Sequence, residues 1–322
     1  LTRRFTAGPL LVVAAFAASL SLAAFALSSN WTLFLGAGFT LGLAGGVLDS
    51  GVNAYVAVHR GARAMGVVHT GFGIGSTLGP LFVTALLALG ASWRVAFGSL
   101  AMADLLLAIA FLATISAIEG NIGSTGRRPS VGGNRVVLGL SVAVFFLYAG
   151  VAAGTGAWTF SLLTEGRGIS DGVAGMAVAA YWAGMTVARV ALGVFGDRVD
   201  PNRVLTISGF ATVASLGLLW LAPVPWIGLA GLIASGISHG AVFPLEILLT
   251  PRRFGDAFTP WAVGYEIAGA NVGVALLSGS IGLLVGRFGI EAVAPALVVL
   301  AALFWAAIEL LRIRSTEASR VA

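Results

Sequence analysis

Asp49 and Asn53 are the polar residues whose positions most directly suggest chemistry. They stand four residues apart inside the apolar stretch LGLAGGVLDSGVNAYVAV, so on a helix they share one face. A charged residue at the centre of a bilayer costs at least about 2.5–3.5 kcal/mol, and such residues normally face a cavity. A carboxyl group there can hold and release a proton, and the neighbouring amide can bond a solute hydroxyl. We therefore predict a substrate or proton site at both residues, with bonds to a neighbouring helix as the alternative.

A second set of candidates combines polar and aromatic side chains from later apolar stretches. Glu266 and Asn271 lie in VGYEIAGANVG, where the carboxylate offers another protonatable group unless it sits at the membrane boundary. Tyr148 and Trp158 bracket LYAGVAAGTGAW, a glycine-rich and therefore loosened helix. Together with Trp182 they suit stacking on the ring of a solute, although aromatic residues also form belts at membrane interfaces.

Arg189 and His69 are charged or titratable residues for which the sequence leaves two roles open. Arg189 is predicted to be structural, either snorkelling to the membrane surface or pairing with an acid on the next helix, with a substrate contact as the alternative. His69 can relay protons or simply pack. Glu246 and His239 share a face of a helix that Pro244 should kink, which makes them candidates for gating.

The residues lack the patterns that catalysis requires. There is no cysteine, which excludes disulfides, thiolate metal sites and cysteine nucleophiles. A His-Glu zinc motif, a phosphate-binding P-loop and a nucleophile elbow are also missing. We therefore expect no enzyme, no metal, no cofactor and no nucleic-acid partner.

The elements that must position these residues are long apolar stretches. Hydrophobic residues make up 58% of the 322 and charged residues only 10%, against about 25% charged in soluble domains. A helix needs roughly 20 apolar residues to cross a bilayer. Ten stretches reach that length: 9–27, 32–58, 66–89, 91–118, 136–163, 172–195, 204–222, 226–250, 261–285 and 292–311. Because barrel strands would alternate polar and apolar residues, we predict an all-α polytopic membrane protein with ten transmembrane helices.

The basic residues between the stretches indicate how the chain is oriented. All 18 are arginines, and 14 of them fall in alternate gaps. The other gaps hold only Arg94, Arg167 and Arg287, and Arg189 lies within a stretch. The positive-inside rule places the arginine-rich gaps in the cytoplasm. Both termini are then cytoplasmic, in a plasma (inner) membrane protein that the lipid bilayer surrounds.

The gap EGNIGSTGRRPSVGGN divides the chain unequally. It covers 119–134 and resembles a flexible cytoplasmic linker, with four stretches before it in 1–118 and six after it in 135–322. Repeat-built transporters often join two equal bundles. The opening LTRRF also resembles the end of the basic turn GVFGDRVDPNRV, which follows the second stretch of the later half. We therefore expect an incomplete front bundle that lacks its first two helices, joined to a complete six-helix bundle.

Two motifs carry a resemblance to the major facilitator superfamily. One is a turn with small and charged residues at the spacing of that superfamily's signature loop, although Asp200, Pro201 and Asn202 interrupt the usual basic run. The residues of the turn are Gly193, Gly196, Asp197, Arg198 and Arg203. The other motif, GIGSTLGP, ends in Gly79 and Pro80 and resembles the superfamily's fifth helix. The pattern from Asp49 to Asn53 resembles the fucose permease branch of sugar transporters.

The resemblance implies a fold of two bundles around a central cavity and an activity of alternating access. It implies a secondary transporter, symporter or antiporter, of a small polar solute such as a sugar, with protons as the coupling ion. The alternative is a truncated or partner-dependent membrane protein that does not transport.

Overall fold

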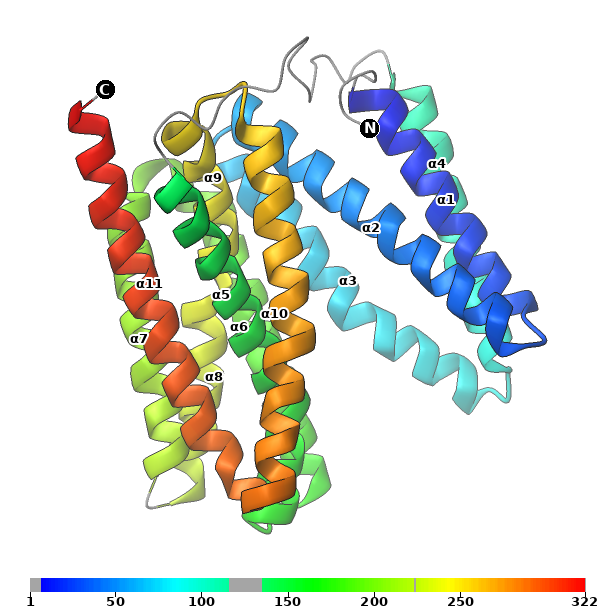
Figure 1. Cartoon of the computed structure of the whole chain (residues 1–322). Helices are drawn as coiled ribbons and strands as arrows, with labels where there is room; N and C mark the ends of the chain where they lie inside the picture. Colours follow the sequence, from blue (N-terminus) through cyan, green and yellow to red (C-terminus); the bar gives the residue numbers. More distant parts are fainter. Residues whose placement is uncertain (1–6, 116–134, 223, 322) are drawn as a thin grey trace.

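The chain folds into long helices arranged in two groups (Figure 1). A computed structural model describes residues 7–115, 135–222 and 224–321. The predicted linker at 119–134 lies outside these described residues. The front group contains α1 (Ala7–Leu27), α2 (Trp31–His59), α3 (Ala62–Ala88) and α4 (Trp93–Ala113).

The C-terminal group contains the remaining helices. They are α5 (Arg135–Ser161), α6 (Asp171–Phe195), α7 (Pro201–Leu221), α8 (Pro225–Gly240), α9 (Val242–Phe254), α10 (Thr259–Phe288) and α11 (Val293–Val321). Nine helical segments of the described residues are long and apolar enough to span a membrane, and α8 with α9 counts as one of them. The described elements are all helices, so the predicted all-α membrane architecture is confirmed. The predicted number of ten spans holds approximately, because α3, with 27 residues, occupies the place of the third predicted stretch in addition to the nine.

The break between α8 and α9 follows from the sequence. A proline has no N–H and cannot bond the carbonyl four residues earlier. Pro244 therefore leaves the carbonyl of Gly240 without its helical partner, and the helix is interrupted at Ala241. The interruption lies three residues before the proline, within the turn where a proline acts.

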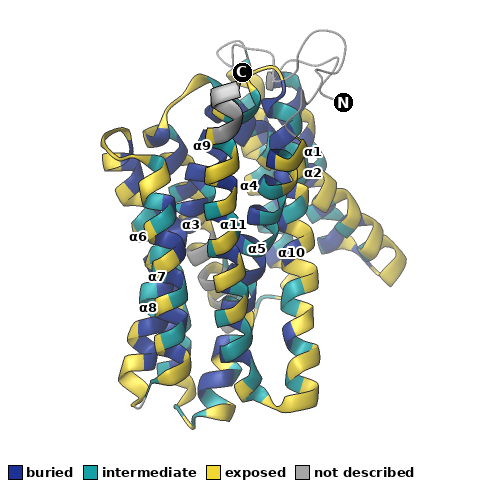
Figure 2. Ribbon diagram, turned by 60° about the vertical axis from the view of Figure 1, so that its left-hand side comes forward, coloured by how far each residue is buried: buried dark blue, intermediate teal, exposed yellow. Residues whose placement is uncertain are grey.

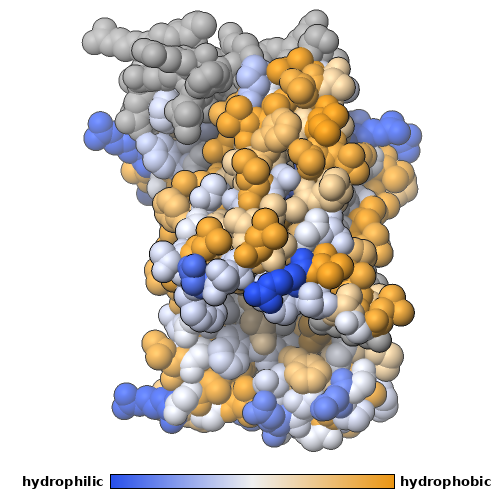
Figure 3. All heavy atoms as spheres, turned by 90° about the vertical axis from the view of Figure 1, so that its right-hand side faces the viewer, coloured by the Kyte–Doolittle hydropathy of each residue, from blue (hydrophilic) through white to orange (hydrophobic). Residues whose placement is uncertain are grey.

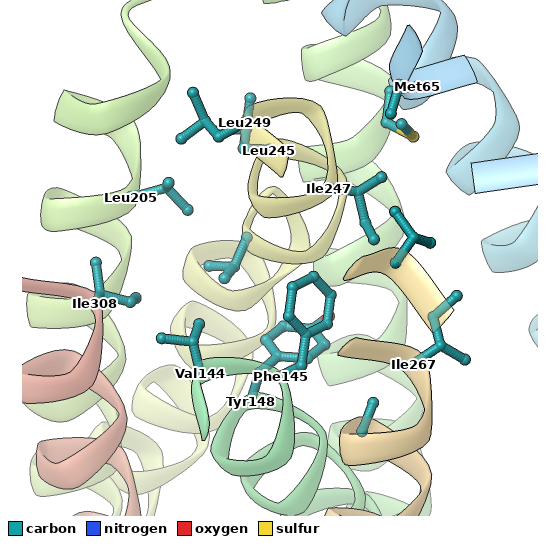
Figure 4. Packing of buried hydrophobic residues seen from close by; sticks show 14 of the residues in the cluster. Met65, Val144, Phe145, Tyr148, Leu205, Leu245, Ile247, Leu249, Ile267 and Ile308 are labelled. Carbon is teal, nitrogen blue, oxygen red and sulfur yellow. The ribbon is translucent and has the colours of Figure 1, made fainter. Parts of the chain in front are cut away.

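The two groups meet at one end and diverge toward the other (Figure 1). The end where they meet also carries the chain termini. Contacts between the groups run from α3 to α6, from α2 to α10 and from α2 and α3 to α9. One hydrophobic cluster crosses this junction, because it contains Met65 of α3 together with Phe145, Leu245 and Ile267 of the C-terminal group (Figure 4).

The outer surface is largely apolar, as a lipid-facing surface requires. Exposed residues alternate with buried ones along the outer helices (Figure 2), and many of the exposed ones are large hydrophobics such as Leu20, Phe39, Leu106 and Leu283. Figure 3 shows apolar side chains gathered over the upper part of one face. The hydrophobic side chains outside the core therefore face the position of the bilayer's hydrocarbon.

Glycine allows α5 and α10 to pack closely. A Cβ on Gly273 would overlap the carbonyl oxygen of Phe146 and lie 2.8 Å from its carbon, whereas a Cβ on Gly279 would meet nothing within 4 Å. We expect Gly273→Ala to lower the free energy of unfolding by about 1–3 kcal/mol, the usual cost of overpacking. Thermal denaturation of the detergent-purified protein measures this. Gly279→Ala is the control, and an equally stable Gly273→Ala would contradict the packing.

Candidate functional site

Asp49, Asn53 and His69 form a hydrogen-bonded chain that links α2 to α3. The Asn53 amide nitrogen donates to the Asp49 carboxylate at 2.7 Å and to the Asp49 carbonyl at 2.9 Å. The amide oxygen of Asn53 lies 3.0 Å from Nε2 of His69. Because that oxygen can only accept, Nε2 carries the hydrogen. Asn53 and His69 are buried while Asp49 is exposed, so the chain runs from an accessible carboxyl group into the interior.

Aromatic contacts continue this chain into the C-terminal group. The His69 ring meets the ring of Phe243 edge-on, with centroids 5.1 Å apart. Phe243 in turn lies 5.7 Å from Tyr148, which stacks on His239 at 4.5 Å. The polar residues of α2 and α3 thus reach a buried aromatic layer formed by α5, α8 and α9.

Arg189 projects from α6 into the same layer. It is 5% exposed, and its Nε donates to the carbonyl oxygen of Gly240 at 3.3 Å. Its Nη2 donates to the Tyr148 hydroxyl at 3.5 Å. The predicted ion pair with an acid of the next helix is not formed among the residues that the structure describes.

Glu266 belongs to a separate, fully buried network inside the C-terminal group. Ser141 donates to its carboxylate at 2.5 Å, and Thr250 donates to both carboxylate oxygens at 3.0 and 3.1 Å. One helical turn from Thr250, Glu246 accepts a hydrogen bond from Arg253 at 2.6 Å. Glu266 therefore has neutral donors and a nearby ion pair around it, and Asn271 on the same helix is exposed.

The two tryptophans contact neighbouring helices. The indole N–H of Trp158 donates to the carbonyl oxygen of Ser278 at 3.0 Å. Trp182 meets the Tyr181 ring edge-on at 5.1 Å and packs over Gly156, where a Cβ would lie 2.5 Å from the indole. Both indoles are partly buried, so each joins helices while leaving part of its ring accessible.

The signature-like turn after α6 lies against the start of α3. Asp197 accepts from the backbone N–H of Arg63 at 3.5 Å. A Cβ on Gly196 would lie 2.9 Å from the Ala62 side chain, and Gly193 meets Gly66 backbone to backbone. Arg198 and Arg203 are exposed, and Gly79–Pro80 lies within the continuous helix α3. The turn therefore fastens the two groups at the end where they meet.

Two features of the site did not emerge from the sequence. The Glu246–Arg253 ion pair is almost completely buried, with side chains 2% and 6% exposed, although the sequence places Arg253 in a gap between two apolar stretches. Their seven-residue spacing on one helix face was the available signal. The second feature is the hydrogen bond between His69 of α3 and Asn53 of α2, two residues that are 16 positions apart in the chain.

Comparison with known proteins identifies the family. The model of the Major Facilitator Superfamily matches residues 140–321, more than half of the chain. The chain belongs to the Major Facilitator Superfamily. It is accordingly a multi-pass membrane protein with the fold that its helix arrangement displays.

Two sugar transporters resemble the chain at low identity. The glucose/mannose transporter GlcP of Bacillus subtilis is 22% identical over 279 residues, which are 81% of this chain and 68% of that protein. A glucose/galactose transporter of Brucella abortus is 25% identical over 264 residues, 76% of this chain and 64% of that protein. The chain thus spans about two thirds of the length of these relatives.

Solved structures of the superfamily have the same fold. FucP in the outward conformation superposes with a TM-score of 0.81 at 15% identity, covering 96% of this chain and 84% of that one. The proton:xylose symporter XylE gives a TM-score of 0.72 at 14% identity, covering 94% of this chain and 80% of that one.

Proposed function

We propose that this superfamily member is a secondary transporter that moves a small polar solute of the sugar class together with protons. The observation that carries the proposal is the chain from Asp49 through Asn53 to His69, which starts at an accessible carboxyl group and ends at the junction of the two helix groups. The relatives that are glucose transporters favour the sugar class. FucP and XylE, whose fold the chain shares, are named as proton symporters.

Asp49 would serve as the proton carrier in this cycle. Its carboxylate accepts a short, charge-assisted bond from the Asn53 amide. Protonation removes the charge and weakens that bond, which frees the amide to bond a solute hydroxyl. Asn53 also forms a hydrogen bond with His69 of α3, and α3 contacts α6. Protonation of Asp49 would therefore alter the hydrogen bonding of a helix that lies at the junction of the two groups.

The arrangement of the two groups fits one state of an alternating-access cycle. If the arginine-rich gaps are cytoplasmic, the termini and the junction of the groups lie on the cytoplasmic side. The groups then diverge toward the outside (Figure 1), which agrees with the similarity to FucP in the outward conformation. We propose that the Asp197 turn and α3 separate when the transporter opens inward.

The test of the proton role is Asp49→Asn. In proteoliposomes, we expect this variant to lose D-glucose accumulation driven by a pH gradient by at least about tenfold, which corresponds to about 1.4 kcal/mol. Exchange of D-glucose without a gradient should persist, because the amide keeps the size and hydrogen-bonding capacity of the side chain. Asp171→Asn, at the exposed start of α6, is the matched control. Unchanged gradient-driven accumulation in Asp49→Asn would refute the proton role.

A further inference from the structure

Arg189 brings a positive charge into the interior of the protein without an acidic partner. The side chain is 5% exposed. None of the salt bridges that the structure shows in the described part of the chain includes it. Burying a charge costs several kcal/mol unless a counter-charge or good hydrogen bonds compensate. An intramembrane cation without an acid therefore needs an explanation beyond packing.

One edge of the guanidinium has a structural role. Pro244 leaves the carbonyl of Gly240 without a helical partner, and Nε of Arg189 donates to that oxygen at 3.3 Å. The carbonyl ends α8, where the helix dipole supplies roughly half a negative charge. This contact satisfies one orphaned acceptor and compensates part of the positive charge.

The opposite edge of the guanidinium has only weak, neutral partners. Nη2 lies 3.5 Å from the Tyr148 hydroxyl and 3.3 Å from the sulfur of Met185. Nη1 makes no hydrogen bond to the residues that the structure describes. A guanidinium carries five N–H donors in a planar fork that matches a carboxylate, so donors remain available on this edge.

The groups that surround Arg189 from the other helices add no negative charge. His239 of α8 has its Nε2 on the carbonyl oxygen of Tyr148 at 3.1 Å and its Nδ1 toward Thr212. His69 of α3 is bonded to the Asn53 amide, and Tyr181 donates to the carbonyl of Ala152. These side chains are neutral donors or acceptors in their hydrogen-bonding arrangements.

A solute can approach Arg189 from the junction between the two groups. The guanidinium lies 5.1 Å from the centre of the Phe72 ring, which comes from α3 on the other side of the junction. Phe72 is 60% exposed, so the ring that packs over the guanidinium from the front group is itself accessible. The Asp49–Asn53–His69 chain begins on the same side of the junction.

We propose that Arg189 binds the carboxylate of the transported solute, and that the substrate is a sugar acid or a similar hydroxylated monocarboxylate. The free edge of the guanidinium would hold the two carboxylate oxygens, and the Tyr148 hydroxyl can donate its own hydrogen to one of them. A single guanidinium matches a single negative charge, which favours a monoanion. The inference rests on the proposed transport function and specifies its substrate class.

Binding of two matched probes to the purified full chain tests the inference. D-glucuronate and D-glucose share one ring and differ by the carboxylate, and titration calorimetry measures both. We expect wild type to bind D-glucuronate at least about tenfold more tightly than D-glucose. Arg189→Gln should weaken D-glucuronate by about 10–100-fold and leave D-glucose within about twofold, while the exposed Arg287→Gln changes neither.

Each other outcome has a definite meaning. Wild type that binds D-glucose more tightly than D-glucuronate, or an Arg189→Gln variant that weakens both probes equally, would overturn the inference and leave sugar transport standing. Wild type that binds neither probe would contradict the proposed sugar class and the inference together. If Arg189→Gln does not fold, Arg189→Lys is tested instead. An ammonium keeps the positive charge but lacks the planar pair of donors of a guanidinium, so this variant should weaken the binding of D-glucuronate and not that of D-glucose. Equal effects on both probes in that variant would overturn the inference.

Discussion

Replacing Arg253 by methionine should lower the free energy of unfolding by about 3–5 kcal/mol, the usual cost of breaking a buried ion pair. Arg253 Nη1 lies 2.6 Å from the Glu246 carboxylate, and both side chains are almost inaccessible. The other carboxylate oxygen of Glu246 has no hydrogen-bond partner among the described residues. The variant would therefore leave a buried negative charge without this counter-charge. Thermal denaturation in detergent measures the loss.

A double-mutant cycle separates the charge from the packing. Adding Glu246→Gln to Arg253→Met removes the buried charge, and we expect this to restore at least about half of the lost stability. Arg252→Met changes an exposed neighbour and is the matched control. A double variant as unstable as Arg253→Met would show that the arginine acts through packing alone.

The second large effect should come from Gly66→Ala. A Cβ on Gly66 would overlap the backbone nitrogen of Gly193 and lie 2.7 Å from its Cα. Backbone atoms cannot rotate away as a flexible side chain can, so α3 and α6 must move apart at the junction. We expect the rate of solute transport in proteoliposomes to fall by at least about tenfold, which is equivalent to about 1.4 kcal/mol.

Thiol labelling can detect the separation directly, because the chain has no cysteine of its own. Ala62→Cys places a reporter at a position that is 5% exposed beside Gly196. In the Gly66→Ala background, this thiol should react faster with a membrane-impermeant maleimide from the side that carries the termini. Gly71→Ala is the control, since a Cβ there meets nothing within 4 Å. Equal labelling rates in all backgrounds would contradict the close junction.

The sequence predicts the elements well because apolar length and helix periodicity are local properties. The stretch around Asp49 is recognisable from hydropathy, and the spacing to Asn53 places both side chains on one face, where they form a hydrogen bond. Pro244 likewise predicts a kink, because its missing N–H acts within one turn. The break at Ala241 is the local consequence.

The partners across helices could not be predicted, because they depend on how helices pack. Trp158 suits sugar stacking by residue type, yet its N–H is bonded to a carbonyl of α10, 120 residues away. Glu266 lies within the candidate span Thr259–Phe288, but its neighbours Ser141 and Thr250 come from α5 and α9. The glycines of α5 suggested a loosened helix, whereas α5 is continuous and Gly150 lies against Leu277. A small residue permits either flexibility or close packing, and only the neighbouring helix decides between them.

Coupled movement of protons and solute is the central claim, and one measurement tests it directly. The full chain is reconstituted in vesicles that contain a pH-sensitive dye, and D-glucose or D-glucuronate is added outside. We predict that the vesicle interior acidifies with at least one of the two solutes, and that Asp49→Asn abolishes this acidification. Solute uptake without any change of internal pH, or the absence of both uptake and pH change in the wild-type protein, would contradict the account.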